Sequence, residues 1–230
     1  GGWLNFNTRT NLTTGETESI NTYDLSNVTL QSRSRFGQTL MSYAFDGQGQ
    51  LASFTDPNSH TTTLSNYKRG IPQTIGYPDN TSQSLAVDDF GQISSITDQA
   101  GSTTSYSYDS IGRITGITYP TGDEVAWYPK SFSYAYVTGA ERGIGGGHWR
   151  RITTKGNAVT TTYFDVMLHP ILSDASISGT ANSDISTSTD YDWKGQKTFA
   201  SYPVSGAPDL GSIGSGVSSV YDALGRLTQT

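Results

Sequence analysis

A unit of 21 residues recurs through the middle of the chain and restricts what the chain can fold into. Four glycines at this spacing mark its copies: Gly49, Gly70, Gly91 and Gly112. A further apolar residue follows each glycine at a constant distance: Phe54, Ile75, Ile96 and Ile117. A second turn signal comes next, so turns recur every 10 or 11 residues. This is the spacing of a strand plus a turn, and a helical repeat would not be interrupted so often.

The repeated Asp-x-x-Gly pattern predicts a hairpin turn. Asp at the first position of a type I turn accepts backbone hydrogen bonds, and Gly at the fourth takes the left-handed conformation. The predicted turn residues are Asp46, Gly49, Asp88, Gly91, Asp109, Gly112, Asp192, Gly195, Asp222 and Gly225. Thr, Ser, Tyr, Ile and Val between the turns suit a half-buried pleated surface. We therefore predict an all-β fold, an antiparallel meander of hairpins in a curved or spiralling sheet.

The apolar spacing within one copy also predicts a β-bulge. Ile93 and Ile96 are three residues apart and would face opposite sides of a regular strand. Either both faces are covered or an extra residue intervenes. A bulge next to Gly91 is favoured, because it would also add local twist to a long meander.

The regularity of the repeat divides the chain into four segments. Residues 1–39 hold N-terminal strands that could be degenerate repeats, and residues 40–122 hold the regular repeats. Residues 123–160 predict longer strands with a glycine-rich loop, and residues 161–230 hold irregular repeats. Within the last segment, residues 203–219 are rich in Gly, Ser and Pro and predict a flexible surface loop.

The stretch GSTTSYSYDSIGRIT, residues 101–115, closely resembles the YD repeat of Rhs proteins. That pattern runs Gly, three residues, Arg, Tyr, one residue, Tyr-Asp, two residues, Gly-Arg, Leu or Ile, and Thr. Ser105 stands where the pattern has Arg, and residues 221–228 match its second half. Copies at Asp46, Asp89 and Asp165 are weaker. The residues that carry the motif are Tyr106, Tyr108, Arg113, Ile114, Tyr221, Arg226 and Leu227.

The resemblance implies a structural part of a larger protein. In this family the repeats form a β-sheet that spirals into a hollow shell, as in polymorphic Rhs toxins, Tc-toxin components and teneurins. Such a shell encloses a toxin or effector cargo and is not itself an enzyme. The implied partners are the rest of a parent Rhs-type protein and its cargo domain, and the implied location is secreted or at the surface of a bacterium. The Asp-Pro self-cleavage signature of such shells is not matched at Asp56-Pro57.

Composition argues against several other classes of protein. A net charge of -6 with 14 scattered Lys and Arg residues gives no basic patch for nucleic acid or an anionic membrane. No apolar run approaches the roughly 18 residues of a membrane span, so no membrane insertion is expected. The absence of Cys excludes a disulfide scaffold, a thiolate metal site and a Cys nucleophile.

The sequence contains no pattern typical of a catalytic or metal site, so we predict no enzyme activity, no metal and no cofactor. His60, His148 and His169 lack the spaced partners of a metal site or a triad, which favours structural roles. DYDWKG at residues 190–195 begins like a calcium-binding loop, but its fifth and twelfth positions are wrong. The glycines at 143–147 are not followed by the Gly-Lys-Ser/Thr of a phosphate cradle. Asp123 and Glu124 are adjacent and predict a solvated pair.

A binding module is the alternative hypothesis, and it depends on which way the 14 tyrosines and 4 tryptophans face. Aromatic rows on an exposed sheet could stack on sugar rings or contact a partner protein. If the same side chains fill an inner face, the structural hypothesis is favoured instead. Cut sheet edges could also lead to self-association between edge strands.

Overall fold

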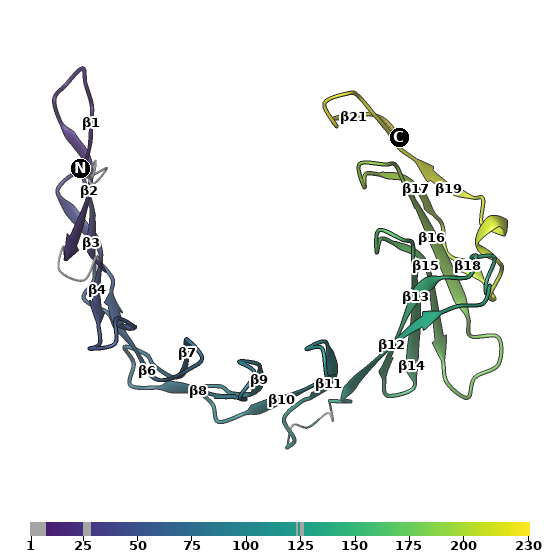
Figure 1. Ribbon diagram of the computed structural model, residues 1–230, viewed down its shortest axis with the longest axis horizontal. Helices are drawn as coiled ribbons and strands as arrows, with labels where there is room; N and C mark the ends of the chain where they lie inside the picture. The colour runs from purple at the N-terminus through teal and green to yellow at the C-terminus, as the bar shows by residue number, and fades with distance from the viewer. Residues whose placement is uncertain (1–7, 25–28, 123, 125–126) are drawn as a thin grey trace. The chain divides into compact units, whose positions relative to one another are not determined.

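The computed structural model describes residues 8–24, 29–122, 124 and 127–230, and confirms the predicted antiparallel meander (Figure 1). The chain forms two compact units, Gly1–Ser105 and Tyr106–Thr230. Pairing continues through one strand that crosses this boundary, so β1 to β19 are strands of one sheet. In the described residues the single helical segment is a 3-10 turn, η1 (Leu210–Ser212). The four segments read from repeat regularity stay a prediction, since the division falls inside the regular repeats.

The first unit is a run of hairpins in which each strand pairs with the next one along the chain. Its strands are β1 (Thr8–Thr10), β2 (Thr17–Asp24), β3 (Thr29–Arg35), β4 (Gln38–Phe45), β5 (Leu51–Thr55), β6 (Thr61–Lys68), β7 (Ile71–Gly76), β8 (Ser82–Val87), β9 (Ile93–Thr97) and the start of β10 (Thr103–Tyr108).

The predicted bulge is present in β9. Ala86 pairs with Ser95 and Val87 pairs with Ile93, so Ser94 is the extra residue. Because Ile96 pairs with Leu85, both isoleucines lie on the face that carries Leu85 and Val87. The same one-residue shift occurs in four other hairpins, formed by β4 and β5, β14 and β15, β16 and β17, and β20 and β21. In the β8–β9 hairpin the bulge therefore keeps Ile93 and Ile96 on one face.

The two faces of the first unit differ in composition. Along β8 the burial alternates, with Gln83 and Leu85 half-buried, Val87 buried, and Ser82, Ser84 and Ala86 exposed. Along β10 the same alternation leaves Thr103, Ser105 and Ser107 exposed. One face therefore carries small polar side chains in contact with solvent, and the other carries the larger apolar ones.

The second unit is also a run of hairpins, closed by a separate two-stranded hairpin. Its strands are the end of β10, β11 (Ile114–Thr118), β12 (Lys130–Val137), β13 (His148–Lys155), β14 (Ala158–Phe164), β15 (Pro170–Ile177), β16 (Ile185–Tyr191), β17 (Lys197–Ser201), β18 (Val204–Ser205), β19 (Gly216–Ser218), β20 (Val220–Tyr221) and β21 (Leu227–Gln229).

The second unit has a small core formed where loops cover one face of the sheet. Buried Ile144, Tyr163, Leu172 and Ile213 pack together, with Ile171, Val204 and Leu210 partly buried against them. Residues 203–219, for which a flexible surface loop was expected, thus include two short strands, η1 and buried Ile213. Apolar residues at 204, 210 and 213 explain the difference, because they bury surface that a Gly, Ser and Pro count does not reveal.

Candidate functional site

The turn of the YD motif is built around one aspartate. Asp109 Oδ1 accepts the backbone N–H groups of Ile111 and Arg113 at 3.1 and 2.9 Å, and Oδ2 accepts Arg113 Nε at 2.7 Å. The N–H of Asp109 donates to the carbonyl of Arg113, and the N–H of Gly112 donates to the carbonyl of Asp109. Gly112 has φ 85°, in the left-handed region. The carboxylate therefore satisfies the backbone donors inside the turn.

The other aspartates named from the sequence make the same contacts. Asp46, Asp88, Asp192 and Asp222 each accept the N–H groups two and four residues further on, at 2.8–2.9 Å. Their glycines all have positive φ: Gly49, Gly91, Gly195 and Gly225. Arg226 Nε reaches Asp222 Oδ2 at 2.7 Å, as Arg113 reaches Asp109. These carboxylates are therefore occupied by their own turns.

Three further turns of this kind lie at the second turn signals Asp56-Pro57 and Asp98 to Gly101 and at the weaker repeat copy of Asp165. Asp56, Asp98 and Asp165 accept the N–H groups two and four residues further on in the same way. The left-handed position is Ser59 in the first and Leu168 in the third, with φ 66° and 64°. An Asp-based turn therefore also forms without glycine at its fourth position.

One repeat copy uses a different turn. Arg69 and Gly70 both have positive φ, at 54° and 79°, and Lys68 pairs directly with Ile71. Two left-handed residues between paired positions form a two-residue type I′ turn. The constant spacing of Gly70 therefore hides a change from the Asp-based turn.

The histidines take structural roles in the turns and the core. His60 Nδ1 and His169 Nδ1 lie 3.1 and 3.0 Å from the Oδ2 atoms of Asp56 and Asp165, the position that Arg takes at Asp109. His169 also stacks on Tyr191, with ring centroids 4.6 Å apart. His148 is 4% exposed and lies between Glu141 Oε1 at 3.1 Å and the Gly145 carbonyl at 2.8 Å.

Four tyrosine hydroxyls each join one hairpin to the preceding one. Tyr67 donates to the carbonyl of Leu51 at 2.6 Å, and Tyr134 donates to that of Ile114 at 3.2 Å. Tyr191 and Tyr221 reach the carbonyls of Pro170 and Lys197 at 3.2 and 3.0 Å. In each case the acceptor is the fifth residue after a turn aspartate, and it is the first residue of the strand that follows the turn. Burial raises the pKa of Tyr67 and of Tyr191.

The remaining motif residues lie on or beside this tyrosine face. Tyr106 and Tyr108 are half-buried on one face of β10, and the Ile114 carbonyl is the acceptor for Tyr134. The Arg113 guanidinium lies 4.4 Å from the Tyr134 ring centroid and 5.4 Å from that of Trp149. Leu227, by contrast, is 54% exposed. Arg113 and Tyr221 thus lie where one hairpin contacts another.

A buried polar cluster in the second unit was not foreseen from the sequence. Asp174 pairs with Arg142 and accepts the Ser186 hydroxyl at 2.7 Å. Arg142 also donates to the Pro208 carbonyl at 2.5 Å. Glu141 accepts Arg150 Nη1 at 2.6 Å, besides its contact with His148. Both oxygens of each carboxylate are occupied, so neither is a free base, and the cluster fixes the covering loops to the sheet.

The described residues offer little for catalysis or metal binding. Within 8–24, 29–122, 124 and 127–230, no group of three or more His, Cys, Asp or Glu side chains could hold a metal ion. Nor is any helix of this part long and apolar enough to cross a membrane. Glu124 is exposed, and its neighbour Asp123 lies outside the described residues.

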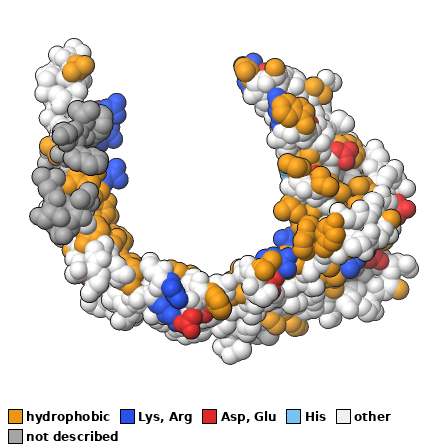
Figure 2. Space-filling model, in the orientation of Figure 1, with side chains coloured by type: hydrophobic (Ala, Val, Ile, Leu, Met, Phe, Trp, Pro, Cys, Tyr) orange, Lys and Arg blue, Asp and Glu red, His pale blue; other side chains and the backbone are white. Residues whose placement is uncertain are grey.

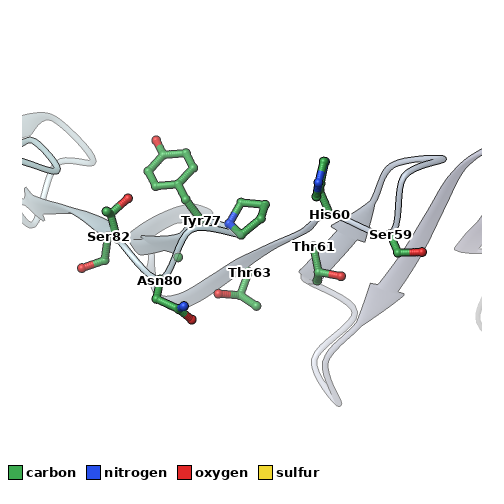
Figure 3. Close-up of a pocket in the computed structure, with 10 residues that line it drawn as sticks. Ser59, His60, Thr61, Thr63, Tyr77, Asn80 and Ser82 are labelled. Atoms are coloured by element: carbon green, nitrogen blue, oxygen red, sulfur yellow. The ribbon is translucent and has the colours of Figure 1, made fainter.

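A shallow groove of about 570 Å³ lies in the first unit, between the turns after β5 and β7 (Figure 3). In Figure 3, Tyr77 and His60 point to one side of the strands, whereas Thr61 and Asn80 point to the other. The Tyr77 hydroxyl donates to Gln83 Oε1 at 2.9 Å, and His60 is held by Asp56. The polar groups of the groove do not point to one common position, so the groove lacks the geometry of a ligand-binding site.

These features define a repeat protein made of stacked β-hairpins, each linked to the last by turn and tyrosine contacts. Residues 87–124 match the family model described as RHS Repeat, and this match confirms the resemblance to the Rhs/YD-repeat family. This range contains the turns of Asp88 and Asp109. No curated protein is significantly similar to the chain in sequence.

Solved structures share the fold over nearly the whole chain. The crystal structure titled TcdB2-TccC3-Cdc42 matches with a TM-score of 0.58 and 13% identity, over 93% of this chain and 13% of that one. The crystal structure of TcdB2-TccC3 matches with a TM-score of 0.51 and 16% identity, over 96% of this chain and 13% of that one. The chain therefore spans about an eighth of the length of the chains it matches.

Replacing Gly112 with alanine is expected to lower the free energy of unfolding by about 1–2 kcal/mol. The reason is that a Cβ is disfavoured at its φ of 85°. Urea denaturation would measure the change. Gly47→Ala is the matched control, because Gly47 has no positive φ and no atom lies within 4 Å of the added Cβ. An equal effect in both variants would contradict the requirement for a left-handed residue at 112.

The turn aspartates predict a loss of stability in acid. Backbone N–H donation from Arg113 holds the pKa of Asp109 below its ordinary 3.8, and Arg226 acts in the same way on Asp222. A pKa lowered by folding stabilises the protein above the unfolded value, and this contribution disappears as pH falls through the folded value. Urea midpoints should therefore be constant near neutrality and fall below about pH 4. Asp109→Asn keeps an acceptor that does not titrate, so its pH dependence should be shallower.

Replacing Tyr67 with phenylalanine is expected to cost about 1 kcal/mol of stability. The substitution removes the 2.6 Å hydrogen bond that the Tyr67 hydroxyl donates to the Leu51 carbonyl. Thermal unfolding would measure the loss. Tyr202→Phe is the control, because Tyr202 is 55% exposed and its hydroxyl makes no hydrogen bond to another described residue. A loss of the same size at Tyr202 would mean that the interhairpin bond is not the cause.

Proposed function

We propose that the chain is a non-enzymatic wall segment of an Rhs-type β-shell that encloses or presents a toxin or effector cargo. The shell would belong to a large secreted or cell-surface bacterial protein, whose remaining repeats and cargo domain are the partners of this segment. The RHS repeat at residues 87–124 and the fold shared with TcdB2-TccC3 chains support the proposal. No cofactor or metal has a part in it.

The observation that carries the proposal is the series of tyrosine bonds between successive hairpins. An isolated hairpin is marginal in water, so a run of hairpins is stable only through its neighbours. Tyr67, Tyr134, Tyr191 and Tyr221 each give their hydroxyl to the backbone of the preceding hairpin. These are contacts suited to extending a wall.

The same bonds bear on the carbohydrate-binding alternative. A tyrosine that donates its hydroxyl inside the sheet and is half-buried offers less edge and face to a sugar ring. Exposed aromatics such as Tyr136, at 56%, and Trp149, at 37%, are the residues on which the alternative would depend. A glycan array of the chain tests it. Saturable binding that is lost in Tyr136→Ala would favour a binding module, and silence across the array would favour the wall.

Enclosure is tested by protease protection in the longer protein that the proposal implies. The cargo domain should resist an added protease while the wall is intact. It should become sensitive when the wall is opened by Asp174→Ala, and an exposed substitution such as Leu227→Ala should leave it protected. A cargo that is digested equally in all three proteins would overturn the enclosing role.

A further inference from the structure

Three hairpin turns of the second unit form one continuous surface. They are the turns at 165–169, 192–196 and 222–226, which follow one another along the unit (Figure 1). His169 stacks on Tyr191, and Lys194 and Gln196 donate to the carbonyls of Ala223 and Gly225 at 3.1 and 3.0 Å. Because these contacts fix each turn against the next, their outward side chains make a single patch.

This turn patch is apolar and exposed. Its side chains are Val166, Met167, Leu168, Trp193 and Leu224, with exposed fractions of 87, 71, 60, 88 and 79%. Figure 2 shows hydrophobic side chains gathered on the visible surface of this unit. At the other ends of the same strands the turns carry mainly small and polar residues, Gly156-Asn157 and residues 178–184. The turns with apolar side chains thus lie at one end of these strands.

Leu168 adds a second observation that folding alone does not explain. It occupies the position that glycine takes in most of the Asp-based turns, with φ 64°, and it is 60% exposed. A left-handed conformation disfavours a Cβ by about 1–2 kcal/mol. Because Leu168 is 60% exposed, burial within the chain offsets only part of this cost, which supports a contact outside the chain.

We propose that the turn patch is a self-association surface, covered by the same patch of a second copy of this chain. Five such side chains present on the order of 700 Å² in all, close to the roughly 800 Å² that each partner buries in a stable interface. A groove of about 350 Å³ lies between the Asp192 turn and the β20–β21 hairpin, beside Trp193. In a two-fold dimer the same surface contacts itself, so it must carry both projecting side chains and a hollow that receives them. The turn patch has both.

The mass of the chain in solution tests the proposal. Light scattering after size exclusion should show the mass rising with concentration from 24.7 kDa towards twice that value. Trp193→Ser with Leu224→Ser should raise the dissociation constant by at least about a hundred-fold, since buried aromatics dominate interfaces. Leu12→Ser with Phe90→Ser removes similarly exposed side chains, at 99 and 88%, from the other unit and should change nothing.

Leu168→Gly distinguishes association from folding. Dilute monomer should unfold at a higher temperature in this variant, because the strain at φ 64° is relieved, while the dimer should dissociate more readily. A mass of one chain at every concentration would overturn the proposal, as would equal dissociation by the patch and control variants. A monomer that instead pellets with neutral phosphatidylcholine vesicles would overturn it in favour of a lipid contact.

Discussion

Asp174→Ala is expected to destabilise the second unit by about 3–5 kcal/mol, because it leaves the Arg142 guanidinium buried without its partner. Asp174 is 8% exposed, and it also accepts the Ser186 hydroxyl at 2.7 Å. Chemical denaturation monitored by tryptophan fluorescence would measure the loss, since Trp149 lies on β13 of this unit.

The paired substitution separates charge from packing. Asp174→Leu combined with Arg142→Met removes both charges, so it should cost less than Asp174→Ala alone. Asp174→Asn keeps an acceptor for Ser186 and should fall between the two. A loss below 1 kcal/mol in Asp174→Ala would show that the cluster does not hold the covering loops on the sheet.

Leu172→Ala is expected to cost about 2–5 kcal/mol, the range for removing a fully buried leucine side chain. Leu172 is 1% exposed and packs with Ile144, Tyr163 and Ile213, which come from two loops and a neighbouring strand. The cavity would therefore loosen the loops as well as the sheet. Urea unfolding gives the measurement.

Leu227→Ala is the matched control for Leu172→Ala, since the same atoms are removed from a side chain that is 54% exposed. Its effect should stay within about 0.5 kcal/mol. If the two variants lost the same stability, the core of the second unit would not be where the structure places it.

The hairpin turns could be predicted from the sequence because their contacts are local. Asp109 accepts hydrogen bonds from residues two and four positions away, so a sequence of five residues specifies the turn. The bulge at Ser94 could also be inferred, since the spacing of Ile93 and Ile96 is incompatible with a regular strand. Where glycine is replaced, as by Leu168, the copy at Asp165 is a weaker match to the repeat pattern.

The core of the second unit could not be predicted in the same way. Arg142 contacts Asp174 and Pro208, which are 32 and 66 residues away along the chain. No periodicity connects these positions, and the covering residues lie in stretches that look like loops by composition. The turn patch was also missed, because only the contacts between turns show that the turns carrying Val166, Trp193 and Leu224 lie against one another.

The tyrosine bonds between hairpins have a consequence for how such sheets diverge. Their acceptors are backbone carbonyls, and the residues that supply them are as different as Leu51, Ile114, Pro170 and Lys197. Any amino acid, proline included, provides that carbonyl. The joint between hairpins therefore tolerates substitution on its accepting side, so sequences that keep the tyrosine and the turn aspartate can drift widely elsewhere.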